Sequence, residues 1–293
     1  MQHHRLMDAL LEGQQLLLEK GIESARLECE MLMSHILKCE RHQLYIMGNE
    51  PLELSLQLAY QSMLEKRLNG EPIQYILGNK EFMGLSLNVD RRVLIPRFDT
   101  EVLVESVLDA VASKPAPIRI LDLGTGSGAI AISLAVHLPK SVITAVDIKE
   151  DALCVAQHNA ELNMVSDKID FYCGDLFYAL DNDRYQGFFD VIVSNPPYIP
   201  SSDIDSLMTE VKDFEPRSAL DGGSDGLDFY RRIADTAYKF LRLDGLVAVE
   251  IGYGQGSAVQ SIFREVGKYC EMITIKDLAG IDRVAAFNKL FKE

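Results

Sequence analysis

The sequence predicts an α/β protein, in which a mostly parallel, seven-stranded sheet with helices on both faces follows a small all-helical domain. Three observations predict this class. From about Glu101 onward, short apolar runs alternate with helix-like stretches, a pattern typical of parallel sheets covered on both sides. A glycine-rich turn follows the first of these runs. The first 70 residues show leucines at helical spacing and no convincing strand pattern.

Composition and charge limit the classes of function. The chain has 293 residues, which is long for one ordinary domain. Its formal charge of -15 repels a phosphate backbone and disfavours generic nucleic-acid binding. No apolar run reaches the roughly 18 residues of a membrane span. The five cysteines are scattered and lack metal-site spacing, so we expect reduced thiols, no metal and a cytoplasmic location.

The elements are expected in a simple order. Residues 1–70 form the helical domain. Residues 71–100 form a β-hairpin linker, broken by Gly78 and Gly84, and an irregular entry segment. Residues 101–293 form the α/β domain. Its predicted strands are IRILDLG, SVITAVDI, KIDFYCGD, FFDVIVSN, LVAVEIG, EMITIKDL and RVAAFNKL. The last two have no helix between them, so we expect them to pair antiparallel.

The stretch LDLGTGSGAIAISLA follows the first predicted strand and opens a helix. Gly124, Gly126 and Gly128 allow the backbone to turn tightly and to approach a ligand closely. The helix start then directs N–H groups at that ligand. Together with Thr125 and Ser127, these glycines form the candidate cofactor loop. The alternative is an ordinary strand–helix turn that needs glycine.

Two acids follow the next two predicted strands. Asp147 ends the second strand, where an acid can accept both hydroxyls of a ribose, unless it caps the next helix. Asp175 follows the third strand and can bond an adenine amino group, while Leu176 or Phe177 packs on the ring. Turn and core roles are the alternative for these residues. Ligands of open α/β sheets bind at the carboxyl ends of strands, so all are candidate cofactor ligands.

The glycine loop fits two cofactors. Gly124, Gly126 and Ala129 also match the G-x-G-x-x-A pattern of NAD enzymes, so an NAD-dependent dehydrogenase is one alternative. Asp122 favours S-adenosylmethionine (SAM), because an acid before the loop can meet an ammonium group and would repel a pyrophosphate. The end of the fourth predicted strand also favours SAM.

That fourth strand ends in DVIVSNPPYIP. The carboxamide oxygen of Asn195 can accept one N–H. Pro196 and Pro197 supply no N–H and hold the residues before them extended. The Asn195 oxygen and the Pro196 carbonyl can therefore accept both hydrogens of one –NH2 group, while Tyr198 offers a flat face for stacking. Such a clamp would stabilise the positive charge that grows on a nitrogen during methyl transfer; the alternative is a turn that closes a strand.

With these motifs placed, nearly the whole chain resembles the HemK/PrmC family, the peptide chain release factor glutamine N5-methyltransferases. EPIQYILG and EFMGLSLNV are similar to its linker, LIPRFDTE to its entry segment, DLGTGSGAIAI to its cofactor loop and SNPPYI to its clamp. FEPRSALDGGSDGLDFYRRI resembles the stretch after the clamp, and EIGYGQG the fifth strand end. Two residues depart from the pattern: Phe98 replaces a second proline, and Leu176 stands where some members have tryptophan.

The resemblance implies a SAM-dependent methyltransferase with a Rossmann-like fold. Its expected substrate is the glutamine in the Gly-Gly-Gln loop of release factors, which residues 1–70 help to hold. The residues from Gly124 to Gly128 and Asp147 would hold SAM. Asn195, also near SAM, would hold the glutamine amide with Pro196, Pro197 and Tyr198. Asn195, Pro196 and Tyr198 are the candidate catalytic residues.

We expect a monomer without a direct nucleic-acid or membrane partner. The main alternative function is an amino methyltransferase acting on an adenine or guanine of nucleic acid, flipped into the same clamp. A non-catalytic binding module that keeps the fold is a further alternative.

Three further groups of charged residues near the predicted ligand-bearing edge of the sheet have alternative roles. Arg97 and Asp99 of the entry segment either shape the cofactor pocket or pair with each other. Glu250 ends the fifth predicted strand at the ligand-bearing edge, where a structural role is favoured over a chemical one. Glu215 and Arg217 are expected to order a loop over the substrate.

Overall fold

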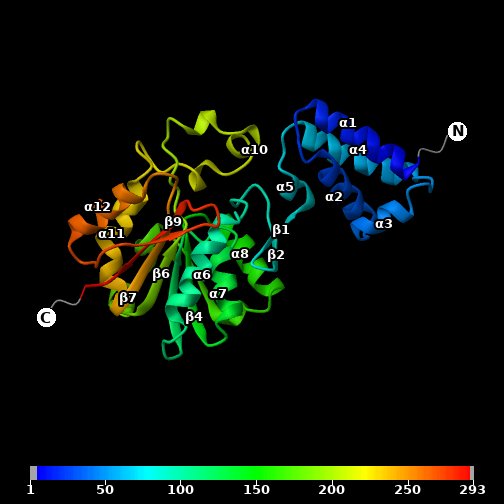
Figure 1. Cartoon of the computed structure of the whole chain (residues 1–293). Coiled ribbons are helices and arrows are strands. Elements are labelled where there is room, and N and C mark those ends of the chain that lie inside the picture. The colour runs from blue at the N-terminus through cyan, green and yellow to red at the C-terminus, as the bar shows by residue number, and fades with distance from the viewer. Residues whose placement is uncertain (1–4, 291–293) are drawn as a thin grey trace. The chain divides into compact units, whose positions relative to one another are not determined.

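The computed structural model describes residues 5–290, which form two compact units (Figure 1). The helical unit consists of residues 5–78 together with residues 209–214. The sheet unit consists of residues 79–208 and 215–290. In the described part of the chain, no helix is long and apolar enough to cross a membrane.

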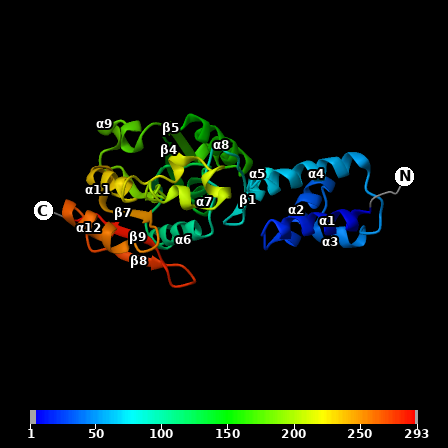
Figure 2. The same ribbon diagram turned by 90° about the horizontal axis from the view of Figure 1, so that it is seen from above.

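The helical unit surrounds one small apolar core. Helices α1, α2 and α4 contact one another (Figures 1 and 2). The leucines of α1 divide as an amphipathic helix requires: Leu6, Leu10 and Leu17 are buried, whereas Leu18 is 48% exposed. The helices are α1 (Leu6–Glu19), α2 (Ala25–Leu37), α3 (Arg41–Ile46), α4 (Leu54–Leu68), α5 (Ile73–Leu77) and α10 (Thr209–Lys212).

A buried arginine holds α10 in the helical unit. Arg67 is 3% exposed, and its guanidinium lies 2.5 Å from Glu28 and 2.6 Å from Glu210. Thr209 approaches so closely that a Cβ added to Gly70 would lie 2.8 Å from its methyl group. Removing one partner of a buried ion pair is strongly destabilising. Residues 209–214 are therefore fixed to helices far away in sequence.

A β-hairpin precedes the sheet, as predicted. Its strands β1 (Asn79–Phe82) and β2 (Leu85–Asn88) pair antiparallel. The carboxamide of Asn159 in α8 (Glu150–Leu162) accepts a hydrogen bond from Asn88 N at 2.7 Å and donates to Asn88 O at 2.9 Å. It also donates to the carbonyl of Ser127 at 2.9 Å. One buried side chain thus joins the hairpin to the glycine-rich turn.

The central sheet has seven strands in the order β5-β4-β3-β6-β7-β9-β8. Strands β3 to β7 are parallel, and β9 runs antiparallel to both β7 and β8. This confirms the predicted fold class and the antiparallel pairing of the last two strands. The strands are β3 (Ile118–Leu123), β4 (Ser141–Asp147), β5 (Ile169–Cys173), β6 (Phe189–Ser194), β7 (Leu241–Glu250), β8 (Ile273–Lys276) and β9 (Asp282–Asn288).

Helices cover both faces of this sheet (Figure 2). One core contains Leu103 and Ile132, from the helices α6 (Asp99–Val111) and α7 (Ala129–His137). The other contains Tyr230 and Phe263, from α11 (Asp228–Phe240) and α12 (Gly256–Val266). Because both faces are filled, the carboxyl ends of the strands are the place where a ligand can approach.

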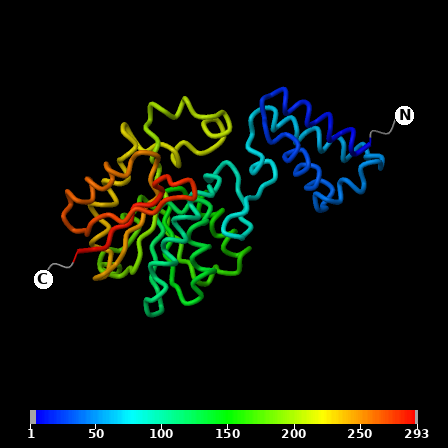
Figure 3. The backbone as a smooth tube through the Cα atoms, viewed as in Figure 1, coloured from blue at the N-terminus to red at the C-terminus, as the bar shows by residue number. Residues whose placement is uncertain are grey.

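The connection from β6 to α11 starts at this edge and contains only short helices, as the yellow part of the tube in Figure 3 shows. It includes the predicted clamp. The short helices of the chain outside the helical unit are η1 (Ser166–Lys168), η2 (Leu176–Ala179), α9 (Asn182–Tyr185), η3 (Ile204–Ser206) and η4 (Arg217–Ala219).

Candidate active site

A cavity of about 360 Å³ lies at the carboxyl ends of the parallel strands. The entry segment and the stretch after the clamp contribute Val93 and Pro216 to its lining. Seven predicted site residues line it: Gly124, Gly126, Asp147, Asp175, Leu176, Asn195 and Pro197. The other predicted residues, Thr125, Ser127, Gly128, Pro196 and Tyr198, do not line this cavity.

The glycine loop leaves room for a ligand. Gly124 and Gly126 have left-handed φ values of +73° and +56°, which glycine adopts readily. A Cβ added to either would meet no protein atom within 4 Å, and both residues line the cavity. Gly128 differs, because an added Cβ would lie 2.8 Å from Ile132 and 3.2 Å from Ala156. Gly128 therefore permits close helix packing at the start of α7.

Thr125 fixes the loop from inside. Its hydroxyl donates to Oδ2 of Asp122 at 2.7 Å. Asp122 is fully buried, and this burial raises its pKa to about 7, although the hydrogen bond from Thr125 opposes the shift. Oδ1 of Asp122 has no hydrogen-bond partner among the described residues. Asp122 does not line the cavity, so the direct contact with a ligand ammonium group that the sequence suggested is not part of this geometry.

Asp147 joins the loop to the end of β4. Its carboxylate accepts hydrogen bonds from Gly126 N and from Lys149 N, both at 2.9 Å. The residue before α8 is Lys149, so Asp147 is not its N-cap. Each carboxylate oxygen keeps a second acceptor site, and Asp147 lines the cavity. The arrangement leaves it able to accept ribose hydroxyls.

Just after β5, Asp175 forms an ion pair that the sequence did not indicate. Oδ2 of Asp175 lies 2.6 Å from the guanidinium of Arg232, which also lines the cavity. Leu176 is 9% exposed and lines the cavity with a left-handed φ of +50°. Phe177 instead stacks on Phe240, with ring centroids 4.9 Å apart. Of the two candidates for packing on an adenine ring, Leu176 is the one at the cavity.

The predicted clamp is anchored from behind. Nδ2 of Asn195 donates to Oγ1 of Thr100 at 3.0 Å. Pro196 is buried, and the hydroxyl of Tyr198 lies 3.4 Å from Oε1 of Glu250. The carbonyl of Tyr198 accepts from Nε2 of Gln255 at 2.9 Å. Hydrogen bonds therefore hold both ends of the Asn-Pro-Pro-Tyr segment.

Two glycines enclose the clamp backbone. A Cβ on Gly222 would lie 2.8 Å from the carbonyl of Pro197, and a Cβ on Gly226 would lie 2.3 Å from the carbonyl of Tyr198. Gly226 also has a left-handed φ of +75°. The stretch DGGSDG thus needs glycine because the backbone of the clamp passes directly over it.

Thr100 and Glu250 bond the clamp, and the sequence did not assign them to it. They are 4% and 1% exposed, and the Thr100 hydroxyl donates to Oε2 of Glu250 at 2.7 Å. Burial raises the pKa of Glu250 to about 7, while the hydrogen bond from Thr100 lowers it. The sequence indicated Glu250 only through its position at a strand end, and no sequence pattern indicated Thr100.

The charged residues of the entry segment pair elsewhere. Arg97 bonds Glu215, and Asp99 lies 2.9 Å from Arg283. Arg97 and Asp99 therefore do not pair with each other, and neither lines the cofactor-loop cavity. Arg217 lies 3.3 Å from Asp221. These pairs order the segments on either side of the cavity.

Comparison with known proteins decides the family. Family models of the PrmC N-terminal domain and the methyltransferase small domain match residues 8–78 and 98–211. The release factor glutamine methyltransferase of Geobacter sulfurreducens is 45% identical over 268 residues, covering 92% of this chain and 91% of that protein. The chain belongs to the release factor glutamine methyltransferase family. The Moorella thermoacetica member is 41% identical over 278 residues, covering 95% and 96% of the two chains.

Among solved structures, the hMettl16 catalytic domain in complex with the MAT2A 3'UTR hairpin 6 shares the fold of this chain. It has a TM-score of 0.56 at 16% identity and covers 80% of this chain and 82% of that chain. Identity this low shows the fold alone.

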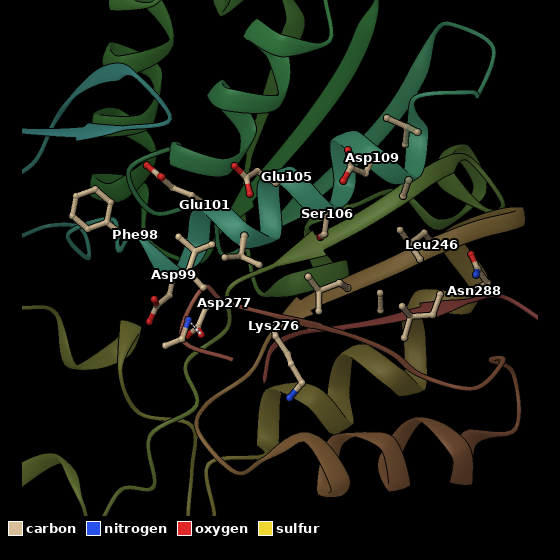
Figure 4. A pocket seen from close by; sticks show the side chains of 18 of the residues that line it. Phe98, Asp99, Glu101, Glu105, Ser106, Asp109, Leu246, Lys276, Asp277 and Asn288 are labelled. Carbon is tan, nitrogen blue, oxygen red and sulfur yellow. Dashed lines mark hydrogen bonds between the residues drawn. The ribbon is translucent and has the colours of Figure 1, made fainter. Parts of the chain in front are cut away.

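One departure from the family pattern lies away from the cofactor loop. Phe98 is 70% exposed and precedes α6, and the ammonium of Lys80 lies 3.8 Å from its ring centroid. Phe98 lines a different, larger cavity of about 1020 Å³ along α6 and β8 (Figure 4). Asp99 also lines that larger cavity, but none of the predicted catalytic, cofactor-binding or substrate-binding residues does. Phe98 therefore lies outside the cavity that the cofactor loop lines.

Proposed function

We propose that this protein transfers a methyl group from SAM to the side-chain amide nitrogen (N5) of the glutamine in the Gly-Gly-Gln loop of peptide chain release factors. One observation carries the proposal: the glycine loop and Asn195 line the same cavity. A group held by the loop would then lie beside a carboxamide that can orient an amide nitrogen. The names of the relatives supply the substrate class.

The residues present fit SAM. The open space at Gly124 and Gly126 would accept its amino-acid tail, and Asp122, hydrogen-bonded to Thr125 of the loop, would favour the positive charge of the ammonium group without lining the cavity. Asp147 would accept the ribose hydroxyls, while Asp175 and Leu176 would contact the adenine. When bound, SAM supplies an electrophilic methyl group.

The clamp would orient the glutamine amide and stabilise its nitrogen during methyl transfer. The Asn195 oxygen and the Pro196 carbonyl would accept the two hydrogens of the glutamine –NH2 group, and Tyr198 would contact the flat face of its amide. Acceptors on these hydrogens stabilise positive charge growing on the nitrogen. Positioning of this kind can supply up to ~7–11 kcal/mol of the barrier. The methylated nitrogen is acidic enough to lose its extra proton to water, so no strong base is required.

The helical unit would hold the release factor. We assign this role to residues 1–70, as the family resemblance implies, and regard the protein as a cytoplasmic monomer. The assignment is tested by the deletion described in the Discussion.

Mass spectrometry of a release factor tests the proposed function. The factor would be incubated with SAM and this protein, and its Gly-Gly-Gln peptide analysed. We expect a gain of one methyl group on the glutamine, and no gain on a factor whose loop glutamine is replaced by asparagine. In parallel, tritiated SAM would be offered to total nucleic acid. Label in nucleic acid with none in the factor would replace this function by a nucleic-acid amino methyltransferase.

A further inference from the structure

A buried chain of hydrogen bonds stands behind the clamp. It runs from Nδ2 of Asn195 to Oγ1 of Thr100, 3.0 Å apart, and from that hydroxyl to Oε2 of Glu250, 2.7 Å apart. The three residues lie at the end of β6, in the first turn of α6 and at the end of β7. Their spacing is therefore set by three different elements of the sheet unit.

The chemistry of these groups allows one direction of donation when Glu250 is ionised. A carboxylate only accepts, so the single proton of the Thr100 hydroxyl is committed to Glu250. The Thr100 oxygen can then only accept from Asn195. An amide oxygen cannot donate, so the carboxamide of Asn195 must turn its nitrogen toward Thr100. Its oxygen is left for the cavity that Asn195 lines.

We propose that Thr100 and Glu250 are positioning residues that fix which end of the Asn195 carboxamide faces the methyl-accepting nitrogen. This inference rests on the proposed function. A flipped carboxamide would present N–H groups to an –NH2 group, so donors would face donors and the clamp would lose one acceptor. The same Glu250 carboxylate lies 3.4 Å from the Tyr198 hydroxyl, so it contacts one end of the clamp directly and the other end through Thr100.

Glu250 is mostly ionised only above pH 7, because its pKa is raised to about 7. Burial and the nearby Asp99 raise its pKa, whereas Arg283 on β9 and the hydroxyls of Thr100 and Tyr198 lower it. The position of Asp99 at the start of α6 can be followed in Figure 4. The Tyr230 hydroxyl on α11 donates to the backbone carbonyl of Glu250 at 2.9 Å. Assays at about pH 8 keep the carboxylate charged, since its pKa is about 7.

A matched pair of variants at Thr100 tests the hydrogen bond from Asn195 to the Thr100 hydroxyl. Thr100→Val keeps the shape of the side chain but removes the hydroxyl, whereas Thr100→Ser keeps the hydroxyl. Leaving the Asn195 amide without its acceptor should lower kcat for release-factor methylation roughly ten-fold or more. Thr100→Ser should keep kcat near the wild-type value, and both variants should bind SAM with wild-type affinity. An unchanged kcat in Thr100→Val would overturn the proposal.

A double-mutant cycle distinguishes positioning from a general structural role. If Thr100 acts through Asn195, then Thr100→Val should cost little further activity in the Asn195→Ala background. Fully additive losses would show that Thr100 acts independently, and the proposal would fail. NMR gives a readout without turnover: the side-chain amide signal of Asn195, identified by its loss in Asn195→Ala, should move in Thr100→Val and stay in Thr100→Ser.

The two proposals fail in different ways. If the wild-type protein methylates no release factor, the proposed function is wrong, whatever the NMR signals show. If the wild type is active and the cycle is additive, only the positioning role of Thr100 and Glu250 is wrong.

Discussion

Asn195 lies where a strand end, a helix start and the cofactor-loop cavity meet. Its nitrogen is bound to Thr100, and its oxygen is available to the cavity. We expect Asn195→Ala to lower methylation turnover on the order of 10²–10³-fold, the usual cost of removing one such polar group. SAM affinity should change much less. Initial rates and calorimetric SAM binding measure the two effects.

A matched control is Asn182→Ala, because Asn182 is an exposed asparagine of the sheet unit that does not line the cavity. Both turnover and SAM affinity should stay at wild-type values there. If turnover of Asn195→Ala were also near wild type, the clamp assignment would be refuted.

Asp122 makes stability depend on pH. Burial raises its pKa from an ordinary 3.8 to about 7, so between these values the folded protein binds one more proton than the unfolded chain. Its contribution to stability is therefore present at low pH and is lost as the pH rises through 7. The variant Asp122→Asn has no titrating carboxyl group at this position, so it serves as the reference. The free energy of unfolding of the wild type, relative to the variant, should fall by a few kcal/mol at most between about pH 5 and about pH 8.

Urea unfolding at the two pH values measures this difference. Glu250 has a pKa raised in the same direction, but it is present in both proteins and cancels in the comparison. A difference that stayed constant with pH would show that Asp122 is ionised in the folded protein throughout.

The clamp as an element depends on glycines that come after it in sequence. Gly226 and Gly254 have nearly equal left-handed φ values, +75° and +77°. An added Cβ would lie 2.3 Å from the Tyr198 carbonyl at Gly226, but would meet nothing within 4 Å at Gly254. Gly254→Ala should therefore cost only backbone strain, about 1–2 kcal/mol. Gly226→Ala should cost a further ~1–3 kcal/mol and displace the clamp.

Denaturant unfolding and methylation rates of these two variants separate strain from close packing. We expect a clear loss of turnover in Gly226→Ala alone. Equal losses of stability and equal turnover in both would mean that the contact between Gly226 and the clamp is unimportant.

Strand β7 shows why an element boundary was missed. The apolar run predicted it from Leu246, whereas it begins at Leu241. Residues 242–244 are exposed, so they lack the apolar pattern of a buried strand. They are held because Leu241 pairs with Phe189 and Arg242 lies 2.8 Å from Asp190. These are contacts with β6 that no local pattern contains.

At the scale of the whole molecule, the chain leaves the sheet unit at residue 209, rejoins the helical unit and returns at residue 215. Residues 5–78 and 209–214 together form the helical unit, and Arg67 bonds Glu210 across 143 residues of sequence. We expect deletion of residues 1–70 to weaken release-factor binding more than SAM binding, since the residues proposed to bind SAM lie in the sheet unit. Calorimetry with the factor and with SAM measures both affinities.

The variant Glu210→Ala is a control for the loss of the ion pair between Arg67 and Glu210. It releases α10 from Arg67 while the helical unit remains, so it reveals how much of the deletion's effect comes from residues 209–214. If the deletion weakened factor and SAM binding equally, the helical unit would be structural only.

The sequence by itself determined the α/β class, the strand order along the chain and the motifs that mark the ligand-bearing edge. These follow from local patterns: apolar runs of strand length, glycines in a strand–helix turn, and prolines after Asn195. The tertiary structure alone decided that Leu176 rather than Phe177 meets the cavity, that Arg232 pairs with Asp175, and that Thr100 and Glu250 stand behind Asn195. Such contacts join residues distant in the chain, and their geometry depends on how separate elements pack.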